Sequence, residues 1–247
     1  MPDPWMLARD AARAADVVLR PIITVEDAAQ VNQVIAHTWG GQHLDPEVVR
    51  ALAVSGNVPW GAEADGVLVG FVLGFAGVDG GGLHVHSHML ASTPDRQHRG
   101  VGYALKLAQR AQALDQGILM VRWTFDPMVA RNAWLNLGKL GATIDRFERN
   151  FYGDMADTIN AGERSDRFTV RWDLTREPGP RGVEGPVRSI GIPAEYHELR
   201  RADPAAAAAA RDAAAAAFEA ALTEGLVGAG FDRGASAYLF GREEDFR

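Results

Sequence analysis

A short basic, glycine-containing stretch stands directly before a predicted helix. Arg96 precedes the residues Gln-His-Arg-Gly-Val-Gly at positions 97–102, and apolar residues then recur at helical spacing, as Val101, Leu105 and Ala108. The first amides of a helix have no partner within the helix, and together with the helix dipole they attract anions. Glycine lets the backbone approach such a ligand closely. The stretch therefore predicts an anion-binding loop.

Two common anion-binding loops do not fit this stretch. A P-loop carries Lys-Ser or Lys-Thr after its last glycine, whereas Tyr103 and Ala104 follow Gly102. The dinucleotide fingerprint needs a third glycine where Leu105 stands, and it follows the first strand of its domain. The anion is therefore not expected to be held in either of these ways.

Three histidines alternate just upstream, at His84, His86 and His88. On a strand this spacing places them on one face of the sheet. Alternate residues of one strand lie about 6.5–7 Å apart, which makes it hard for all three side chains to reach one metal ion. We expect hydrogen-bonded or exposed histidines and no metal, with a three-histidine metal site as the alternative.

Apolar runs and turn residues predict the elements that position these groups. Strands are expected at 17–23, 59–64, 66–77, 83–90, 118–125, 142–152 and 167–174. Helices are expected between Thr24 and Gly40, between Asp45 and Gly56, at 103–116 and at 127–140. Around the anion loop the order is strand, glycine turn, helix and strand, which indicates a parallel βαβ unit. The fold class is therefore α/β (α+β), with a mixed central sheet.

The composition changes after Leu174. Residues 175–186 are rich in proline and glycine, and a strand (187–192), an alanine-rich helix from Pro204 to Gly225 and a final strand or hairpin (227–240) follow. We expect a domain at 1–174 and a C-terminal α/β extension at 175–247. Phe218 and Leu222 are expected to anchor the alanine-rich helix. Its remaining surface is expected to be solvated, with a homodimer face as the alternative.

The overall composition excludes several classes of protein. The chain has 247 residues, no cysteine and a formal net charge of −7, so it has no disulfide, no cysteine nucleophile and no broad basic surface for nucleic acid. It has no apolar run of about 18 residues that could span a membrane. The N-terminal residues also lack the apolar core of a secretory signal. We expect a cytoplasmic protein that binds neither nucleic acid nor membrane.

Gln97, Gly100 and Gly102 match the pattern Gln/Arg-x-x-Gly-x-Gly/Ala, and here the sequence resembles the GNAT superfamily of N-acyltransferases. "ASTPDRQHRGVGYALKLAQRAQALDQGI" resembles that family's strand 4, pyrophosphate loop and helix 3. "WTFDPMVARNAWLNLGKLGA" is similar to its strand 5 and helix 4, and "GAEADGVLVGFVLG" to its strand 2–3 hairpin. The resemblance runs from about Val17 to Leu174. "ERSDRFTVRW" and the tail "IPAEYHELRR" resemble a subgroup of uncharacterised predicted acetyltransferases with a C-terminal extension.

The resemblance implies a GNAT fold, acetyl-CoA or a related short acyl-CoA as co-substrate, and a small-molecule amine as acceptor. The implied cofactor-binding residues lie at the end of strand 4, in the loop and on helix 4. They are Leu90, Ala91, Ser92, Arg96, Gln97, His98, Arg99, Gly100, Val101, Gly102, Asn132 and Asn136.

Direct acyl transfer to an amine needs a base, an oxyanion donor and a proton donor for the leaving thiolate. The resemblance makes His88 the first candidate base and Glu63 the second, and Tyr152 a candidate proton donor. Glu63 as a solvated strand residue and Tyr152 as a packed aromatic are the structural alternatives. Leu137 stands where many members of the family have a tyrosine. A non-catalytic acyl-CoA-binding or partner-binding module is therefore the alternative function.

Overall fold

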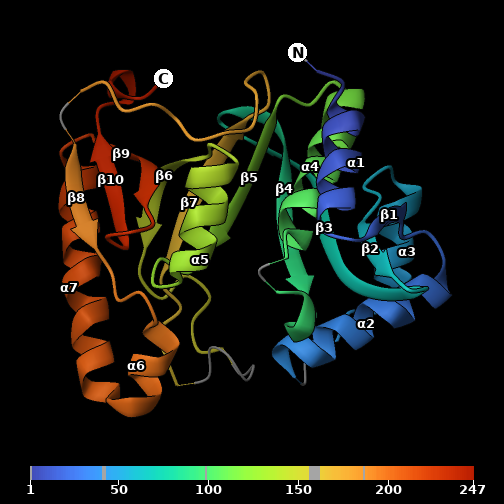
Figure 1. Cartoon of the computed structure of the whole chain (residues 1–247), viewed down its shortest axis with the longest axis horizontal. Helices are drawn as coiled ribbons and strands as arrows, with labels where there is room; N and C mark the ends of the chain where they lie inside the picture. Colours follow the sequence, from blue (N-terminus) through green and yellow to red (C-terminus); the bar gives the residue numbers. More distant parts are fainter. Residues whose placement is uncertain (1, 41–42, 98, 156–161, 186) are drawn as a thin grey trace. The chain divides into compact units, whose positions relative to one another are not determined.

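The structure is a computed structural model that describes residues 2–40, 43–97, 99–155, 162–185 and 187–247. Their contacts group into two compact units, residues 2–122 and residues 123–155 with 162–247. Figure 1 labels the helices and strands of both. The predicted boundary after Leu174 remains a prediction.

The first unit contains five strands and its main helices in the order of the sequence. The elements are α1 (Pro4–Ala14), β1 (Val18–Pro21), α2 (Val25–Trp39), α3 (Pro46–Val54), β2 (Trp60–Ala64), β3 (Val67–Asp79), β4 (Gly82–Ser92), the 3-10 turn η1 (Pro94–Arg96), α4 (Val101–Asp115) and the start of β5 (Met120–Phe125). The strand order is β1-β2-β3-β4-β5. All neighbours are antiparallel except β4 and β5, which pair in parallel at Val85–Val121 and His86–Arg122.

Helices cover both faces of this sheet. Val72 and Leu90 pack with Val101 and Leu105 of α4, and α1 lies along α4 (Figure 1). On the opposite face α2 and α3 pack on Phe71 and its neighbours in β3 and β4. The two core clusters hold β4 between helices, so its two faces have different surroundings.

Local sequence signals explain the helix ends. Thr24 and Asp27 form a reciprocal capping box at the start of α2, and Asp45 caps α3 immediately before Pro46. The same signals, Asp3 and Pro4, begin α1, which was not predicted. Trp5 of α1 donates its indole N–H to Asp115 at 2.7 Å and so fixes α1 on α4.

The second unit begins within β5, at Trp123. Its elements are α5 (Ala130–Ala133), the π-helix η2 (Trp134–Lys139), β6 (Thr143–Glu148), β7 (Arg167–Asp173), β8 (Arg188–Gly191), α6 (Tyr196–Ala202), α7 (Pro204–Thr223), β9 (Val227–Asp232), β10 (Ala237–Gly241) and the 3-10 turn η3 (Glu243–Asp245). The strand order is β5-β7-β6-β9-β10-β8. The C-terminal residues therefore continue the sheet beyond β6.

The predicted helix at 127–140 differs from the observed one. The α-helical part covers only Ala130–Ala133 and passes directly into the π-helix. Gly138 lies against the indole of Trp134, where a Cβ would overlap the ring. The wider π turn and a residue without a side chain together accommodate this indole.

The alanine-rich helix α7 buries one face in the second unit. Its buried residues are Ala207, Arg211, Ala214, Ala215, Phe218 and Ala221. Phe218 packs against Phe168 of β7 and Tyr238 of β10, with ring centroids 4.6 and 5.3 Å away. The anchoring role predicted for Phe218 is confirmed, whereas Leu222 is only partly buried.

Candidate functional site

The N-terminus of α4 is open to a ligand. Gly100 is its N-cap, with a left-handed backbone at φ 92°, and no side chain in the described part of the chain caps the helix. The first hydrogen bond within the helix runs from the Ala104 amide to the Gly100 carbonyl. The first-turn amides before Ala104 therefore have no carbonyl of the same helix to bind, which gives an anion site at this end.

Two arginines, Arg96 and Arg99, precede α4 and differ in their exposure to solvent. Arg99 is exposed. The Arg96 side chain is 15% exposed and lies 3.6–3.8 Å from the carboxylates of Asp16, Asp65 and Asp95. Its Nη1 has no hydrogen-bond partner among the described residues. His98 lies outside the described residues.

A β-bulge interrupts β4 at His88. Met89 pairs with Leu73 and Ser87 with Gly74, so His88 is the extra residue. The residue inserted at a bulge does not take part in the regular ladder, which exposes its backbone groups and redirects its side chain. Beyond the bulge, Leu90–Ser92 pair with Gly70–Val72 on β3 and lead into η1 and the loop.

The histidines of β4 lie together on the face of the sheet that α2 covers. His86 and His88 have ring centroids 6.1 Å apart, and Phe75 of β3 lies 5.2 and 5.9 Å from them. His84 is buried beside the backbone of Gly82, with Nδ1 3.2 Å from its carbonyl oxygen. No group of three potential ligands in the described part of the chain could hold a metal ion.

His86 and His88 both favour their neutral form. Burial lowers the pKa of His86, and the neighbouring His88, His84 and Lys106 lower it further. Burial also lowers the pKa of His88. A neutral imidazole has a free ring nitrogen that can accept a proton, so either side chain is chemically able to act as a base near neutral pH.

A buried lysine of α4 contacts β4 on the face opposite to the histidines. Lys106 of α4 is 2% exposed, and its ammonium group donates to the hydroxyl of Ser87 at 2.7 Å and to Gln109 at 3.5 Å. Burial lowers its pKa well below the ordinary value. The sequence prediction missed this group, although Lys106 stands between Leu105 and Leu107 on a predicted helix and is one of only two lysines in the chain.

Glu63 of β2 belongs to an ion-pair network with Arg20 of β1 and Asp27 of α2. Arg20 of β1 donates to Glu63 at 2.7 Å and to Asp27 at 2.6 Å. Burial opposes ionisation of Asp27, but the amides of Thr24 and Ile23 and the Arg20 guanidinium outweigh it and lower the pKa of Asp27 to about 2. The Glu63 carboxylate is therefore held by a cation and is not left open for a substrate proton.

The remaining candidates lie in the second unit. Tyr152 is 44% exposed, and its hydroxyl lies 3.0 Å from the Thr124 hydroxyl on β5. Asn132 of α5 is partly buried, whereas Asn136 of the π-helix is 4% exposed. Leu137 is fully buried.

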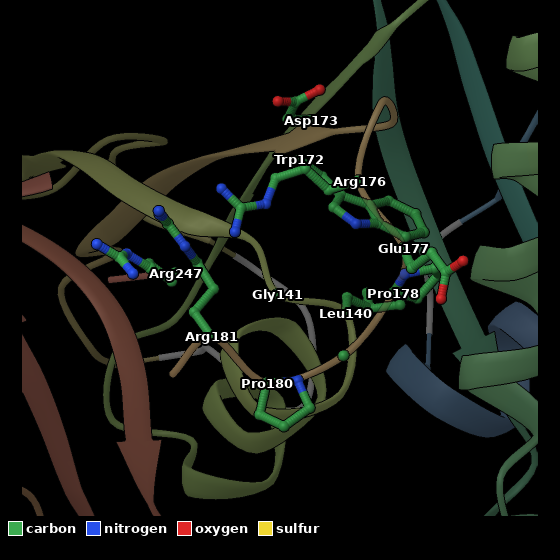
Figure 2. Close-up of a pocket in the computed structure, with 11 residues that line it drawn as sticks. Leu140, Gly141, Trp172, Asp173, Arg176, Glu177, Pro178, Pro180, Arg181 and Arg247 are labelled. Atoms are coloured by element: carbon green, nitrogen blue, oxygen red, sulfur yellow. The ribbon is translucent and has the colours of Figure 1, made fainter. Parts of the chain in front are cut away.

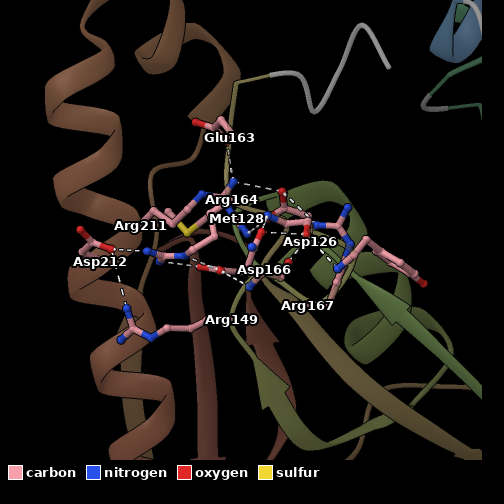
Figure 3. A network of polar contacts seen from close by, with 12 residues as sticks. Asp126, Met128, Arg149, Glu163, Arg164, Asp166, Arg167, Arg211 and Asp212 are labelled. Atoms are coloured by element: carbon pink, nitrogen blue, oxygen red, sulfur yellow. Dashed lines mark hydrogen bonds and ion pairs between the residues drawn. The ribbon is translucent and has the colours of Figure 1, made fainter. Parts of the chain in front are cut away.

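The second unit also contains a buried ionic network that the sequence prediction missed (Figure 3). Arg211 of α7 is 4% exposed and binds both carboxylate oxygens of Asp126 at 3.1 and 3.3 Å and Glu163 at 2.8 Å. Although burial disfavours its charge, the attraction of Asp126 raises the pKa of Arg211. Tyr196 donates its hydroxyl hydrogen to Glu163. The network joins α6, α7 and the end of β5, so its role within this unit is structural.

No protein-family model and no curated protein matches the chain. Solved structures do match it. Ribosomal-protein-S18-alanine N-acetyltransferase from Escherichia coli superposes with a TM-score of 0.50 at 14% identity, over 65% of this chain and 96% of that one. The yncA structure from Salmonella typhimurium, with its cofactor acetyl-CoA, gives 0.50 at 18% identity, over 66% and 97%. Chaetomium thermophilum Naa20, in complex with a bisubstrate analogue, gives 0.51 at 16%, over 66% and 94%. At these identities the likeness shows the fold alone.

Proposed function

We propose that this chain, which has the GNAT fold over about two thirds of its length, is an acyl-CoA N-acyltransferase. It would move an acetyl or other short acyl group, such as succinyl, to the primary amine of a small molecule such as an amino acid. The observation that carries the proposal is the uncapped, glycine-led N-terminus of α4, which follows β4 through a short basic loop. The cytoplasmic location expected from the sequence belongs to the same proposal.

The loop would hold the pyrophosphate of the acyl-CoA. The amides of Val101 and Gly102 begin α4, and Gly100 adopts the left-handed backbone that starts the helix without strain. Arg99 is exposed and free to move toward a phosphate. Arg96 has three carboxylates around it, so in this proposal it mainly braces the loop.

The bulged strand would hold the acyl-bearing arm. The residues after the bulge, Leu90–Ser92, use one edge for β3. Their other edge would accept the amides of the pantetheine arm as an added strand does. A backbone N–H released at the His88 bulge is suited to stabilise the oxyanion that forms when the amine attacks the thioester carbonyl.

The proton from the attacking amine would go to His88. Its lowered pKa keeps the ring neutral near pH 7, and the bulge places it next to the strand segment that would bind the arm. Glu63 is less suited because Arg20 holds its carboxylate. Tyr152 would supply the proton to the thiolate, since its phenolic O–H is accessible.

One observation favours a second candidate, a non-catalytic acyl-CoA-binding module. Leu137 occupies the helix position where a proton-donating tyrosine was expected, and it is fully buried. Release of free thiol from acetyl-CoA and succinyl-CoA, measured with a panel of amino acids and diamines, separates the two functions. Binding without thiol release across the panel would favour the module.

The loop itself is tested by measuring the binding of coenzyme A by calorimetry. The wild type is compared with two variants, Gly100→Asp and Gly100→Asn. Both side chains tolerate the left-handed backbone of Gly100 better than other residues, so the pair differs mainly in charge. At about 5 Å from a pyrophosphate with two charges, a carboxylate costs roughly 1.5–7 kcal/mol for dielectric constants between about 80 and 20. We expect Gly100→Asp to bind at least about tenfold more weakly than Gly100→Asn. Equal affinity of the two variants, or no binding by the wild type at millimolar coenzyme A, contradicts the proposal.

A further inference from the structure

A pocket in the second unit is lined by none of the candidate site residues described above. It has a volume of about 230 Å³ and is formed by the end of η2, the end of β7 and the segment that follows β7 (Figure 2). Its lining includes Leu140, Trp172 and three arginines, Arg176, Arg181 and Arg247. Arg247 pairs with Glu184 at 2.9 Å, which leaves Arg176 and Arg181 as the arginines beside the two lining carboxylates, Asp173 and Glu177.

Arg181 is the buried cation of this pocket. Its side chain is 8% exposed, and its two terminal nitrogens donate to the Thr143 hydroxyl at 3.0 Å and to the Phe246 carbonyl at 2.7 Å. Its Nε is buried and has no hydrogen-bond partner among the described residues. A buried donor without a partner costs free energy, which an acceptor in the pocket would recover.

The charge of Arg181 is also poorly balanced. Burial lowers the pKa of its guanidinium, and Arg176 lowers it further, while Glu243 at 3.5 Å offsets part of the effect. In Figure 2 the guanidinium groups of Arg176 and Arg181 lie on the same side of the pocket. Asp173 accepts hydrogen bonds from the amide and the hydroxyl of Thr175 through one carboxylate oxygen.

Two loops pack closely in the wall of the pocket. Gly141 has φ 73°, and a Cβ there would overlap the carbonyl oxygen of Gly179, so the two loops are in direct contact. Pro178 and Pro180 flank Gly179 and fix the backbone on both sides of it. A preformed wall lowers the ordering cost of binding.

The size of the pocket limits its ligand. A volume of about 230 Å³ equals that of roughly eight water molecules in the liquid and lies below the range of about 300–1,000 Å³ for drug-sized ligands. A nucleotide or coenzyme A is therefore too large to be enclosed. We propose that the pocket binds a small oxyanion, a carboxylate or a phosphate, between Arg176 and Arg181 and over Trp172. Guanidinium groups suit both, because their paired N–H donors match two oxygens of either group.

Equilibrium dialysis of the full chain against inorganic phosphate, and separately against malonate, at constant ionic strength tests this site. We expect the pocket to bind one ion per chain in a saturable way, separately from any ion that the proposed pyrophosphate loop binds. Arg176→Gln should weaken the pocket's ion about tenfold, because a charge-assisted hydrogen bond is lost. The tighter of the two ions identifies the chemistry. Arg181→Lys, which keeps the charge but loses the planar fork, should also weaken binding if the variant remains folded.

Two control variants make the result specific. Arg146→Gln removes an arginine of β6 that is 66% exposed and does not line the pocket, and it should leave binding unchanged. Gly100→Asp should remove only an ion that the proposed pyrophosphate loop binds and should leave the ion in the pocket bound, which separates the two sites. The inference is overturned if neither ion binds saturably up to about 10 mM, if Arg146→Gln weakens binding as much as Arg176→Gln, or if Gly100→Asp abolishes it.

Discussion

Replacement of Gly141 by alanine tests the close contact between the two loops that wall the pocket. Gly141 combines a left-handed backbone, φ 73°, with a neighbouring carbonyl oxygen that leaves no room for a Cβ. Gly225, at the end of α7 in the same unit, has nearly the same backbone, φ 79°, but nothing within 4 Å of the position of a Cβ. Alanine at the two positions therefore carries the same backbone strain and differs only in crowding.

The expected costs follow from these two terms. Left-handed backbone costs an alanine about 1–2 kcal/mol, and the lower entropy of its unfolded chain returns about 0.4–1 kcal/mol. Gly225→Ala should thus lose about 1 kcal/mol of unfolding free energy. At Gly141 the Gly179 oxygen must also move, and such overpacking costs about 1–3 kcal/mol more, for a total of about 2–4 kcal/mol.

Urea unfolding followed by far-ultraviolet circular dichroism measures both variants against the wild type. The decisive quantity is the difference between them, because it cancels the strain that they share. A difference below about 0.5 kcal/mol would refute the reasoning, since the Gly179 loop would then be free to move away and the pocket wall would not be rigid.

Two further predictions concern charges. Arg211→Met should cost about 3 kcal/mol in urea unfolding, because the nearly buried carboxylates of Asp126 and Glu163 lose their hydrogen-bonded cation and keep the more distant Arg167 at 3.8 Å and Arg200 at 3.5 Å. Arg188→Gln, which breaks an exposed pair, should leave the urea midpoint unchanged; equal effects would contradict the burial of the Arg211 network. Below pH 6.5 the melting temperature should fall, because His86 and His88 have lowered pKa values and the unfolded chain then binds more protons. The double variant His86→Gln/His88→Gln should make the melting temperature fall less steeply below pH 6.5, and an unchanged slope would contradict this reasoning.

Much of the first unit follows from short-range signals in the sequence. Thr24 and Asp45 mark helix starts, Gly100 marks the start of α4, and Asp65-Gly66 forms the β2–β3 turn with positive φ at both residues. The GNAT fold that the loop and its flanking segments implied is confirmed. The caps act within one turn of chain, which explains why they can be recognised without tertiary information.

Features that depend on distant partners were not predictable. The bulge at His88 results from the register of β4 on β3, and the π-helix from the packing of Trp134 over Gly138. The burial of Lys106 depends on Ser87, nineteen residues away, and that of Arg181 on Phe246. In each case the sequence shows the residue but not the distant residue that it contacts in the folded protein.

The buried arginine of α7 has a consequence for the alignment of that helix. Six of the seven residues 204–210 are alanine, and so are all five residues 213–217. If α7 shifted along its axis by one turn, one alanine methyl group would therefore replace another at most positions. Such a shift would change little in packing at most positions. It would, however, move Arg211 along the helix axis by about 5.4 Å and so break its contact with Asp126. It would also separate Phe218 from Phe168. Arg211 and Phe218, seven residues apart, are thus the buried side chains that fix the position of this alanine-rich helix. The ion pairs of Asp212 with Arg164 and of Glu219 with Arg149 on its surface fit the same position.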